Sequence, residues 1–286
     1  MEYVTLNNGV KMPVMGYGVW RIDDMEECEK CVLQALESGY RYIDTAVAYE
    51  NEKAVGNAIK KSGVPRSELF ISTKLWTPDT NYEGAKKSFF ESLERLGLDY
   101  IDLYMIHQPY NDYYGAWKAL EELYEEGKIR AIGVDNFTMD RMADFICFQK
   151  TMPAVNFIKV NIHQQCEDDL NYLNDKNIQM MAWSPLSAEN GTIFEEDKLK
   201  VIAQKHNKSI AQIVLRWLYQ RGIVIVTSST KENRMKENKD IFDFELDQED
   251  MLVFKQLGLQ PSRYVAPRSD CLLYTSDAAD ELDGVD

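Results

Sequence analysis

The sequence predicts one α/β domain, a parallel (β/α)8 TIM barrel. Short apolar runs rich in β-forming residues alternate eight times with stretches whose apolar residues recur every three or four positions. The length of 286 residues fits one large barrel, and no Pro/Gly/Ser-rich linker or change of composition divides the chain. Polar side chains follow several of the apolar runs, at the strand ends where barrel enzymes carry their chemistry.

A β-hairpin is predicted ahead of the barrel. Val4-Thr5-Leu6 and Lys11-Met12-Pro13 flank Asn7-Asn8-Gly9, and Asn-Gly between two short apolar runs is a hairpin signal.

The eight barrel strands are predicted as short runs that are apolar on both faces, as expected for a parallel sheet that is buried on both sides. They are residues 17–20, 42–44, 69–74, 101–106, 129–134, 155–160, 179–183 and 223–226. The helical patterns begin at Met25 and near Asn51 and then cover residues 80–96, 113–126, 139–148, 168–176, 195–206 and 209–221. A doubly wound sheet is the alternative, but Gly16-Tyr17-Gly18 lacks the third glycine of a dinucleotide-binding turn.

Four residues at these strand ends contain the parts of a carbonyl-reducing site. Asp44 ends the second strand, Tyr49 lies in the loop after it, Lys74 ends the third strand, and His107 follows the fourth. A tyrosine can protonate a carbonyl oxygen if a nearby ammonium favours its phenolate. A buried lysine needs a partner, and Asp44 offers one. His107 would orient the substrate oxygen as a neutral hydrogen-bond donor.

Other reactive residues are expected to be structural. Cys28 and Cys31 lie on one face of a helical pattern with no second Cys or His pair to complete a zinc site, so we expect core packing. His163 and His206 have no ligand at metal-binding spacing, and no metal site is expected.

The composition argues against two kinds of partner. A formal net charge of −15 disfavours nucleic-acid binding. No apolar run approaches the roughly 20 residues that span a bilayer, and the N-terminus has no secretory pattern. We therefore expect a cytoplasmic protein that binds no membrane. We also expect it to be a monomer.

Five segments, together with the four catalytic positions, resemble the aldo-keto reductase family from about Met1 to about Tyr264. They are Gly16-Tyr17-Gly18-Val19-Trp20, Tyr40-Arg41-Tyr42-Ile43-Asp44-Thr45-Ala46, Leu96-Gly97-Leu98-Asp99-Tyr100-Ile101-Asp102-Leu103-Tyr104, Gly127-Lys128-Ile129-Arg130-Ala131-Ile132-Gly133-Val134 and Ala182-Trp183-Ser184-Pro185-Leu186. The resemblance implies one domain over residues 1–268, with the hairpin plugging the bottom of the barrel.

The resemblance also implies the cofactor, NADPH with NADH possible, and the residues that hold it. Asn136 would bind the nicotinamide carboxamide, Trp183 would stack on the ring, and Arg234 would stack on adenine and reach a phosphate. A helix that starts near Lys231 would offer its N-terminus to phosphate. The further expected cofactor contacts are Gln164, Ser184, Leu186, Ser228, Ser229, Glu237 and Asn238, and the expected apolar substrate pocket is lined by Trp20, Trp76 and Tyr110.

Three positions depart from the family pattern. Asp135 stands where the family usually has serine, Phe157 where it has a carboxamide-binding glutamine, and Thr227-Ser228-Ser229 where it often has a lysine that grips the 2′-phosphate. These departures weaken the expected grip on the cofactor and the preference for NADPH, but they leave the four catalytic positions intact.

The predicted function is reduction of aldehydes and ketones to alcohols by hydride from NAD(P)H, with Tyr49 as the general acid and a small carbonyl compound as substrate. The alternative is a barrel that binds a nicotinamide cofactor as a regulatory or sensing module with little turnover.

Residues 269–286 are expected to be a non-native tail. Residues 271–281 resemble the translation of a sequencing-library adapter, and residues 271–286 contain five acidic residues and no Lys or Arg. Without them the formal net charge would be −10. We expect this segment to be disordered or loosely attached.

Overall fold

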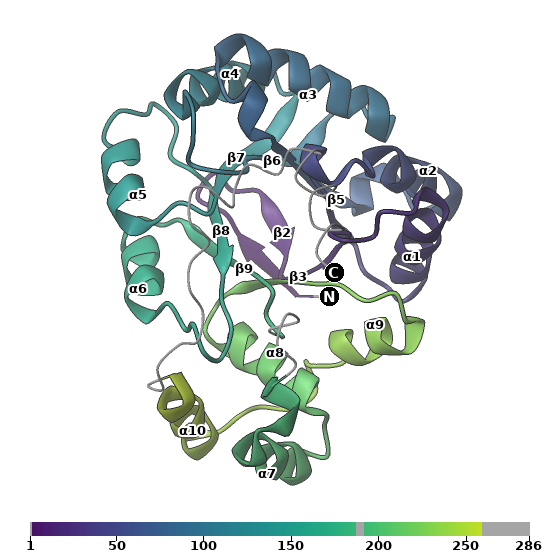
Figure 1. Ribbon diagram of the computed structural model, residues 1–286, viewed down its shortest axis with the longest axis vertical. Coiled ribbons are helices and arrows are strands. Elements are labelled where there is room, and N and C mark those ends of the chain that lie inside the picture. Colours follow the sequence, from purple (N-terminus) through teal and green to yellow (C-terminus); the bar gives the residue numbers. More distant parts are fainter. Residues whose placement is uncertain (1, 187–191, 259–286) are drawn as a thin grey trace, which may run out of the picture.

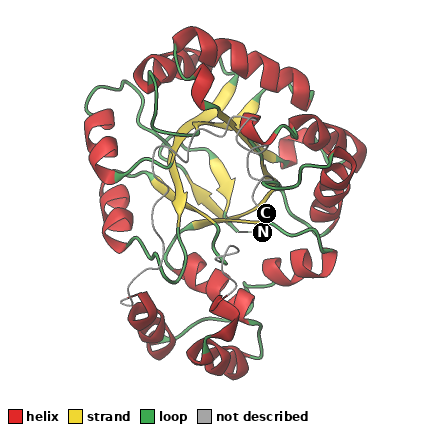
Figure 2. Ribbon diagram, viewed as in Figure 1, coloured by secondary structure: helices red, strands yellow, loops and turns green. Residues whose placement is uncertain are grey.

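The computed structural model describes residues 2–186 and 192–258 of the chain. Eight parallel strands close into a barrel in the order β10-β3-β4-β5-β6-β7-β8-β9. The helices form a ring around this barrel (Figures 1 and 2). The predicted (β/α)8 fold is therefore confirmed, and residues 269–286, with the expected tail, lie outside the described residues.

The barrel strands agree with the prediction except at the first. They are β3 (Met15–Gly18), β4 (Tyr42–Asp44), β5 (Phe70–Leu75), β6 (Ile101–Ile106), β7 (Ile129–Asp135), β8 (Val155–Lys159), β9 (Gln179–Trp183) and β10 (Val224–Thr227). The first strand was predicted at residues 17–20 but occupies Met15–Gly18, so that prediction was wrong by two residues. A Cβ at Gly16 would lie 2.3 Å from the Tyr42 ring, so the glycine permits the close approach of β3 to β4 that β-propensity alone did not show.

The helices follow the strands as predicted, with one addition. They are α1 (Met25–Glu37), α2 (Glu52–Ser62), α3 (Tyr82–Leu96), α4 (Tyr113–Glu125), α5 (Met139–Ile146), α6 (Glu167–Asp175), α7 (Asp197–His206), α8 (Ile210–Gln220), α9 (Glu232–Lys239) and α10 (Gln248–Gly258). The sequence analysis missed α10. Asp247 and Asp250 exchange backbone-to-carboxylate hydrogen bonds of 3.0 and 3.1 Å at its start, and this reciprocal capping pattern could have indicated the helix.

The hairpin of β1 (Tyr3–Thr5) and β2 (Lys11–Pro13) packs into the lower end of the barrel. Leu6 and Met12 belong to one buried cluster with side chains of the barrel strands, among them Tyr42, Phe70 and Val155. The amide of Asn7 donates to the carbonyl of Pro153 at 2.8 Å, just before β8. The hairpin therefore covers the end of the barrel opposite the mouth, where the strands terminate, as the resemblance implied.

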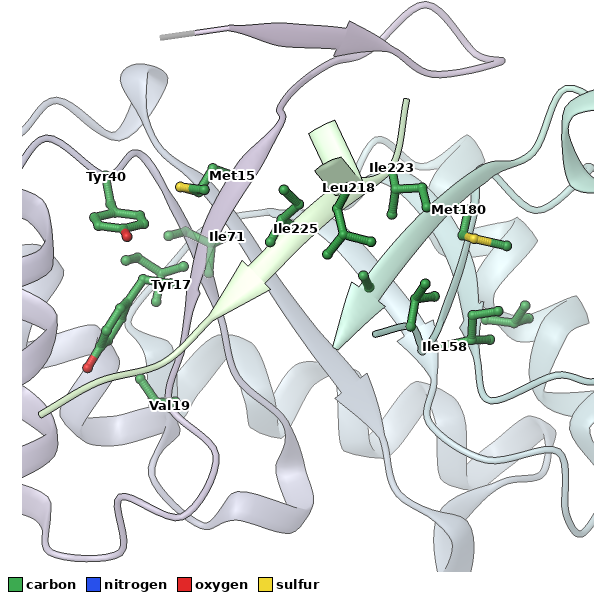
Figure 3. Close-up of a cluster of buried hydrophobic side chains, with 14 of the residues drawn as sticks. Met15, Tyr17, Val19, Tyr40, Ile71, Ile158, Met180, Leu218, Ile223 and Ile225 are labelled. Carbon is green, nitrogen blue, oxygen red and sulfur yellow. The ribbon is translucent and has the colours of Figure 1, made fainter. Parts of the chain in front are cut away.

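A second apolar layer lies between the barrel and the helices. Figure 3 shows side chains of this layer on the outer face of the barrel, among them Tyr17 near Tyr40, and Ile225 near Leu218. Cys28 and Cys31 are buried in it on α1, which confirms their packing role. Burial raises the pKa of the Cys28 thiol to about 12, as expected of an inert core cysteine.

Residues 2–186 and 192–258 contain neither a cluster of metal ligands nor a membrane-spanning helix. No three His, Cys, Asp or Glu side chains in these ranges are grouped so as to hold a metal ion. Within the same ranges, none of the helices has both the length and the apolar character needed to cross a membrane.

The packing of Met12 predicts that the hairpin contributes to stability. Met12 is fully buried, whereas its chain neighbour Lys11 is exposed. We expect Met12→Ala to lower the free energy of unfolding by about 2 to 4 kcal/mol in urea denaturation, because it leaves a cavity in the barrel floor. Lys11→Ala is the control and should change it by no more than about 0.5 kcal/mol. Equal effects of the two substitutions would show that the hairpin is not an integral part of the core.

Candidate active site

The barrel brings the four predicted catalytic residues together at its mouth. Asp44 and Lys74 lie at the ends of β4 and β5, and Tyr49 closes a 3-10 turn at Val47–Tyr49. The amide of His107 donates to the carbonyl of Leu75 at 3.1 Å, so His107 continues the pairing of β6 with β5 by one residue. Residues far apart in sequence are neighbours because the carboxyl ends of parallel strands meet on one rim.

A hydrogen-bonded loop holds Tyr49 in place. The hydroxyl of Thr45 donates to the side-chain oxygen of Asn51 at 2.8 Å, and the amide of Asn51 donates to the carbonyls of Val19 and Ile22 at 3.0 and 3.2 Å. Asn51 is 1% exposed, so these bonds are made out of water and fix the segment that carries Tyr49.

Lys74 and Asp44 form a buried ion pair with an Nζ–Oδ2 distance of 2.7 Å. The ammonium also donates to the carbonyl of Thr45 at 2.9 Å, and the hydroxyl of Ser72 donates to Oδ1 of Asp44 at 2.6 Å. Burial alone would lower the pKa of Lys74, but Asp44, with Tyr49 and Asp135, raises it above its ordinary value. Lys74 is therefore a permanent cation inside the barrel.

Tyr49 lies beside this cation. The Lys74 nitrogen is 5.1 Å from the centre of the Tyr49 ring, and the ring contacts His107 edge-on at 5.7 Å between centroids. Burial raises the pKa of the phenol well above its usual range; the Lys74 ammonium opposes this rise, while Asp44 and Asp135 add to it. Tyr49 thus keeps its proton at neutral pH, and Lys74 reduces the cost of losing it.

His107 is a neutral imidazole at the same rim. Burial lowers its pKa well below the ordinary value, and the nearby Lys74 charge lowers it further. Its Nδ1 atom is buried without a hydrogen-bond partner. The Trp76 ring packs on it at 5.1 Å between centroids, so one of the three predicted substrate-pocket residues contacts His107.

Asn136 and Trp183 are joined at the mouth. The indole nitrogen of Trp183 donates to the side-chain oxygen of Asn136 at 3.1 Å, and the amide of Asn136 donates to the carbonyl of His107 at 3.3 Å. Asn136 adopts a left-handed backbone conformation, with φ of 61°, which turns the chain away from β7. This arrangement places the two proposed nicotinamide contacts next to His107.

Asp135 and Phe157, two of the positions that depart from the family pattern, lie in the same layer of the barrel. Asp135 and Phe157 are register partners on β7 and β8, and both are buried. The Lys74 nitrogen lies 5.3 Å from the centre of the Phe157 ring, and Oδ2 of Asp135 lies 3.9 Å from Nε2 of His107. Burial raises the pKa of Asp135 well above its ordinary value; Lys74 opposes this and Asp44 adds to it.

Lys159 is a charged residue at the mouth that the sequence analysis missed. It is 7% exposed, and its nitrogen lies 5.4 Å from the centre of the Trp183 ring. Its position two residues beyond Phe157, on the same face of β8 as the apolar Val155 and Phe157, was the signal that could have found it.

The expected adenine-side residues lie just before α9 and along it. The hydroxyl of Tyr17 donates to the carbonyl of Ser229 at 2.7 Å, and the amide of Lys231 donates to the Ser229 hydroxyl at 3.1 Å. Ser228 and Arg234 are exposed, Glu237 is half-buried, and Asn238 is buried. Exposed cationic and hydroxyl groups beside a helix N-terminus suit a phosphate.

The remaining residues expected to contact the cofactor or the substrate lie around the same rim, with fewer contacts to the four proposed catalytic residues. Gln164 is half-buried in a turn after β8, and its side-chain oxygen has no hydrogen-bond partner. Ser184 and Leu186 follow β9 directly and are half-buried. Trp20 is 40% exposed with Arg21 over its ring, and Tyr110 is half-buried after β6, neither with a recorded contact to Tyr49 or His107.

Nicotinamide dinucleotide is compatible with these residues. Within the described part of the chain, buried polar atoms without a partner include Nδ1 of His107, Oδ1 of Asp135 and Oε1 of Gln164. Such atoms are rare in folded proteins unless a ligand or water satisfies them. They lie around the proposed nicotinamide contacts, and the phosphate-suited residues lie at the start of α9.

Fold and site together define a barrel oxidoreductase, and comparison with known proteins identifies its family. The model of the aldo/keto reductase family matches residues 14–258, so the chain belongs to that family. It is 46% identical over 274 residues to glyoxal reductase of Bacillus subtilis, which covers 96% of this chain and 98% of the relative. It is 45% identical to 9,11-endoperoxide prostaglandin H2 reductase of Trypanosoma cruzi, covering 89% of this chain and 91% of the relative.

Solved structures agree with this assignment. An aldo-keto reductase from a deep-sea metagenome library of the Medee basin superposes with a TM-score of 0.90 at 40% identity, covering 93% of this chain and 98% of that one. The Bombyx mori aldo-keto reductase in complex with NADP superposes with a TM-score of 0.88 at 32% identity, covering 94% and 96%. The chain is an NAD(P)H-dependent oxidoreductase of carbonyl compounds, and the sensing alternative is not favoured.

The environment of His107 predicts that it does not titrate near neutral pH. In NMR spectra of the imidazole Cε1–H groups, the His107 signal, assigned by its loss in His107→Gln, should keep its neutral position between about pH 8 and pH 6. The physical cause is burial assisted by the Lys74 charge. A titration midpoint at or above about 6.5 would contradict this description.

Proposed function

We propose that the chain reduces aldehydes and ketones with Tyr49 as the general acid. The observation that carries the proposal is the contact of Tyr49 with the buried Lys74–Asp44 pair, since only a cation held against the phenol can offset the cost of its ionisation. The bound cofactor supplies hydride to the carbonyl carbon. Tyr49 delivers its hydroxyl proton to the carbonyl oxygen, and Lys74 stabilises the phenolate that remains.

Asp44 and His107 have supporting roles in this proposal. Asp44 fixes the Lys74 ammonium through a 2.7 Å contact and cannot itself reach water, being 3% exposed. His107 is neutral and therefore suited to donate a hydrogen bond to the carbonyl oxygen without competing as an acid. Trp76, which packs on His107, would form an apolar wall beside the reacting carbon.

The cofactor contacts are part of the same proposal. Trp183 would stack on the nicotinamide, Asn136 would meet its carboxamide, and Ser228, Ser229 and Arg234 would take the phosphates and adenine near the start of α9. Gln164, Ser184, Leu186, Glu237 and Asn238 complete the proposed cofactor set, and Trp20 and Tyr110 the proposed substrate pocket.

The substrate is proposed only as a class. The relatives are named for glyoxal, prostaglandin H2 and morphine, which have little in common beyond oxygen functions. We therefore propose a small carbonyl compound. All four proposed catalytic groups come from one chain, which supports activity as a monomer.

Substitution of Tyr49 tests the acid. We expect Tyr49→Phe to bind NADPH with nearly unchanged affinity and to lower kcat with a generic aldehyde by about 10²- to 10⁴-fold, because the transferred proton is lost. The assay is the loss of NADPH absorbance. Tyr172→Phe on α6 makes the same chemical change far from the mouth and should leave kcat unchanged. Activity of Tyr49→Phe within a few-fold of the parent would exclude Tyr49 as the acid.

Cofactor choice is a second test. Thr227-Ser228-Ser229 lacks the lysine that often grips the 2′-phosphate, although exposed Arg234 and Lys231 retain positive charge there. We expect NADPH to be preferred over NADH, by less than about 10³-fold in kcat/KM, or roughly 4 kcal/mol. Ser228→Lys should increase the ratio, and Ser228→Ala is its control. A ratio above this limit in the parent would show that other groups fully replace the lysine.

A further inference from the structure

Asp135 is a buried carboxyl group that the proposed proton transfer does not use. It ends β7, and alternation along the strand places it on the same inward face as Ala131, which lies in the barrel interior. It is 2% exposed. A serine or an asparagine could occupy this place without bringing an ionisable group into the mouth.

Among residues 2–186 and 192–258, the carboxyl group has no partner that would explain its burial. Oδ1 of Asp135 is buried without a hydrogen bond. Oδ2 lies 3.9 Å from Nε2 of His107, which is longer than a hydrogen bond. His107 is also neutral and cannot serve as a counter-ion. A buried, unsatisfied carboxyl oxygen next to a ligand site points to a group on the ligand.

The charges around Asp135 allow a bound ligand to change the protonation state of its carboxyl group. Lys74 and Asp44 both act on it, with opposite signs, and they are paired with each other. The other titratable groups around it are His107 directly after β6, Tyr49 after β4, Tyr42 on β4 and Lys159 on β8. Burial is the largest influence and favours the protonated acid, so a new cation beside it would favour the carboxylate.

The position of Asp135 places it beside the proposed nicotinamide contacts. Asn136, which follows it directly, is bonded to Trp183 on one side and to the carbonyl of His107 on the other. The nicotinamide ring is a cation when oxidised and neutral when reduced. We propose that Asp135 distinguishes these two states, its carboxylate favouring the oxidised ring, so that NADP⁺ binding releases the Asp135 proton whereas NADPH binding does not.

This inference rests on the cofactor placement under the proposed function. It predicts how the affinities for NADP⁺ and NADPH differ. A carboxylate near the oxidised ring lowers the Kd of NADP⁺ relative to that of NADPH. It would therefore shift the enzyme-bound cofactor toward the oxidised state, the direction in which carbonyl reduction proceeds, and would retain NADP⁺ longer after turnover.

The test measures binding, without turnover, on the full chain. Kd values for NADP⁺ and NADPH are determined by quenching of tryptophan fluorescence between about pH 6 and pH 8.5. In the parent, the ratio of Kd for NADP⁺ to Kd for NADPH should fall as the pH rises. In Asp135→Asn the ratio should not change with pH and should be higher than in the parent at the alkaline end, on the order of tenfold. Asp168→Asn, which removes an exposed charge on α6, is the matched control and should behave as the parent.

Calorimetry gives a second readout that needs no variant. Titration of the parent in two buffers with different heats of ionisation should show more proton release with NADP⁺ than with NADPH. The 2′-phosphate is common to both cofactors, so its protonation cancels in this difference. Equal proton release, or a Kd ratio that Asp135→Asn leaves unchanged, would overturn the inference while leaving the proposed function intact. Failure of the parent to bind either cofactor would overturn the proposed function as well.

Discussion

The buried ion pair of Lys74 and Asp44 is the interaction on which the rest of the mouth depends. Both side chains are almost fully removed from water, so either one alone would be an uncompensated charge in the protein interior. The pair forms only if β4 and β5 keep their register, Asp44 opposite Ser72. A chain of hydrogen bonds from Tyr42 through Ser72 to Asp44 links that register to the barrel floor, where Tyr42 packs in the cluster that includes Met12.

Burial around this pair sets the protonation states that the proposed reaction needs. The same loss of water raises the pKa of Tyr49 and lowers that of His107, because in each case it disfavours the charged form. One group thus remains a proton donor and the other a neutral hydrogen-bonding group across neutral pH. Lys74 acts against burial at Tyr49 and with it at His107, so a single cation adjusts both groups in the direction that favours their proposed roles.

The sequence was sufficient to predict the barrel, the hairpin and the meeting of the four proposed catalytic residues, because each follows from the order of the elements along the chain. The strands of a parallel barrel all end on one rim. Asp44, Lys74 and His107 could therefore be placed on that rim before any distance between them was known. What depends on close packing was not predictable in this way. The start of β3 is set by contact of Gly16 with the Tyr42 ring, and α10 shows only a short capping signal. Lys159 was not predicted, because the sequence pattern alone does not distinguish a buried lysine from an ordinary surface lysine.

The departures at Asp135 and Phe157 change the hydrogen-bonding capacity of the mouth as well as its composition. Asn136 uses its side-chain oxygen for Trp183 and its amide for the carbonyl of His107, which leaves one N–H and one lone pair of the oxygen for a carboxamide. Phe157 has no hydrogen-bonding group and instead places its ring 5.3 Å from the Lys74 nitrogen. Oδ1 of Asp135 is a buried acceptor oxygen without a partner among the described residues, and it belongs to a group whose charge can respond to the ligand. Under the proposed cofactor placement, a carboxyl whose contribution depends on its protonation state would replace the fixed polar groups, serine and glutamine, of the family pattern.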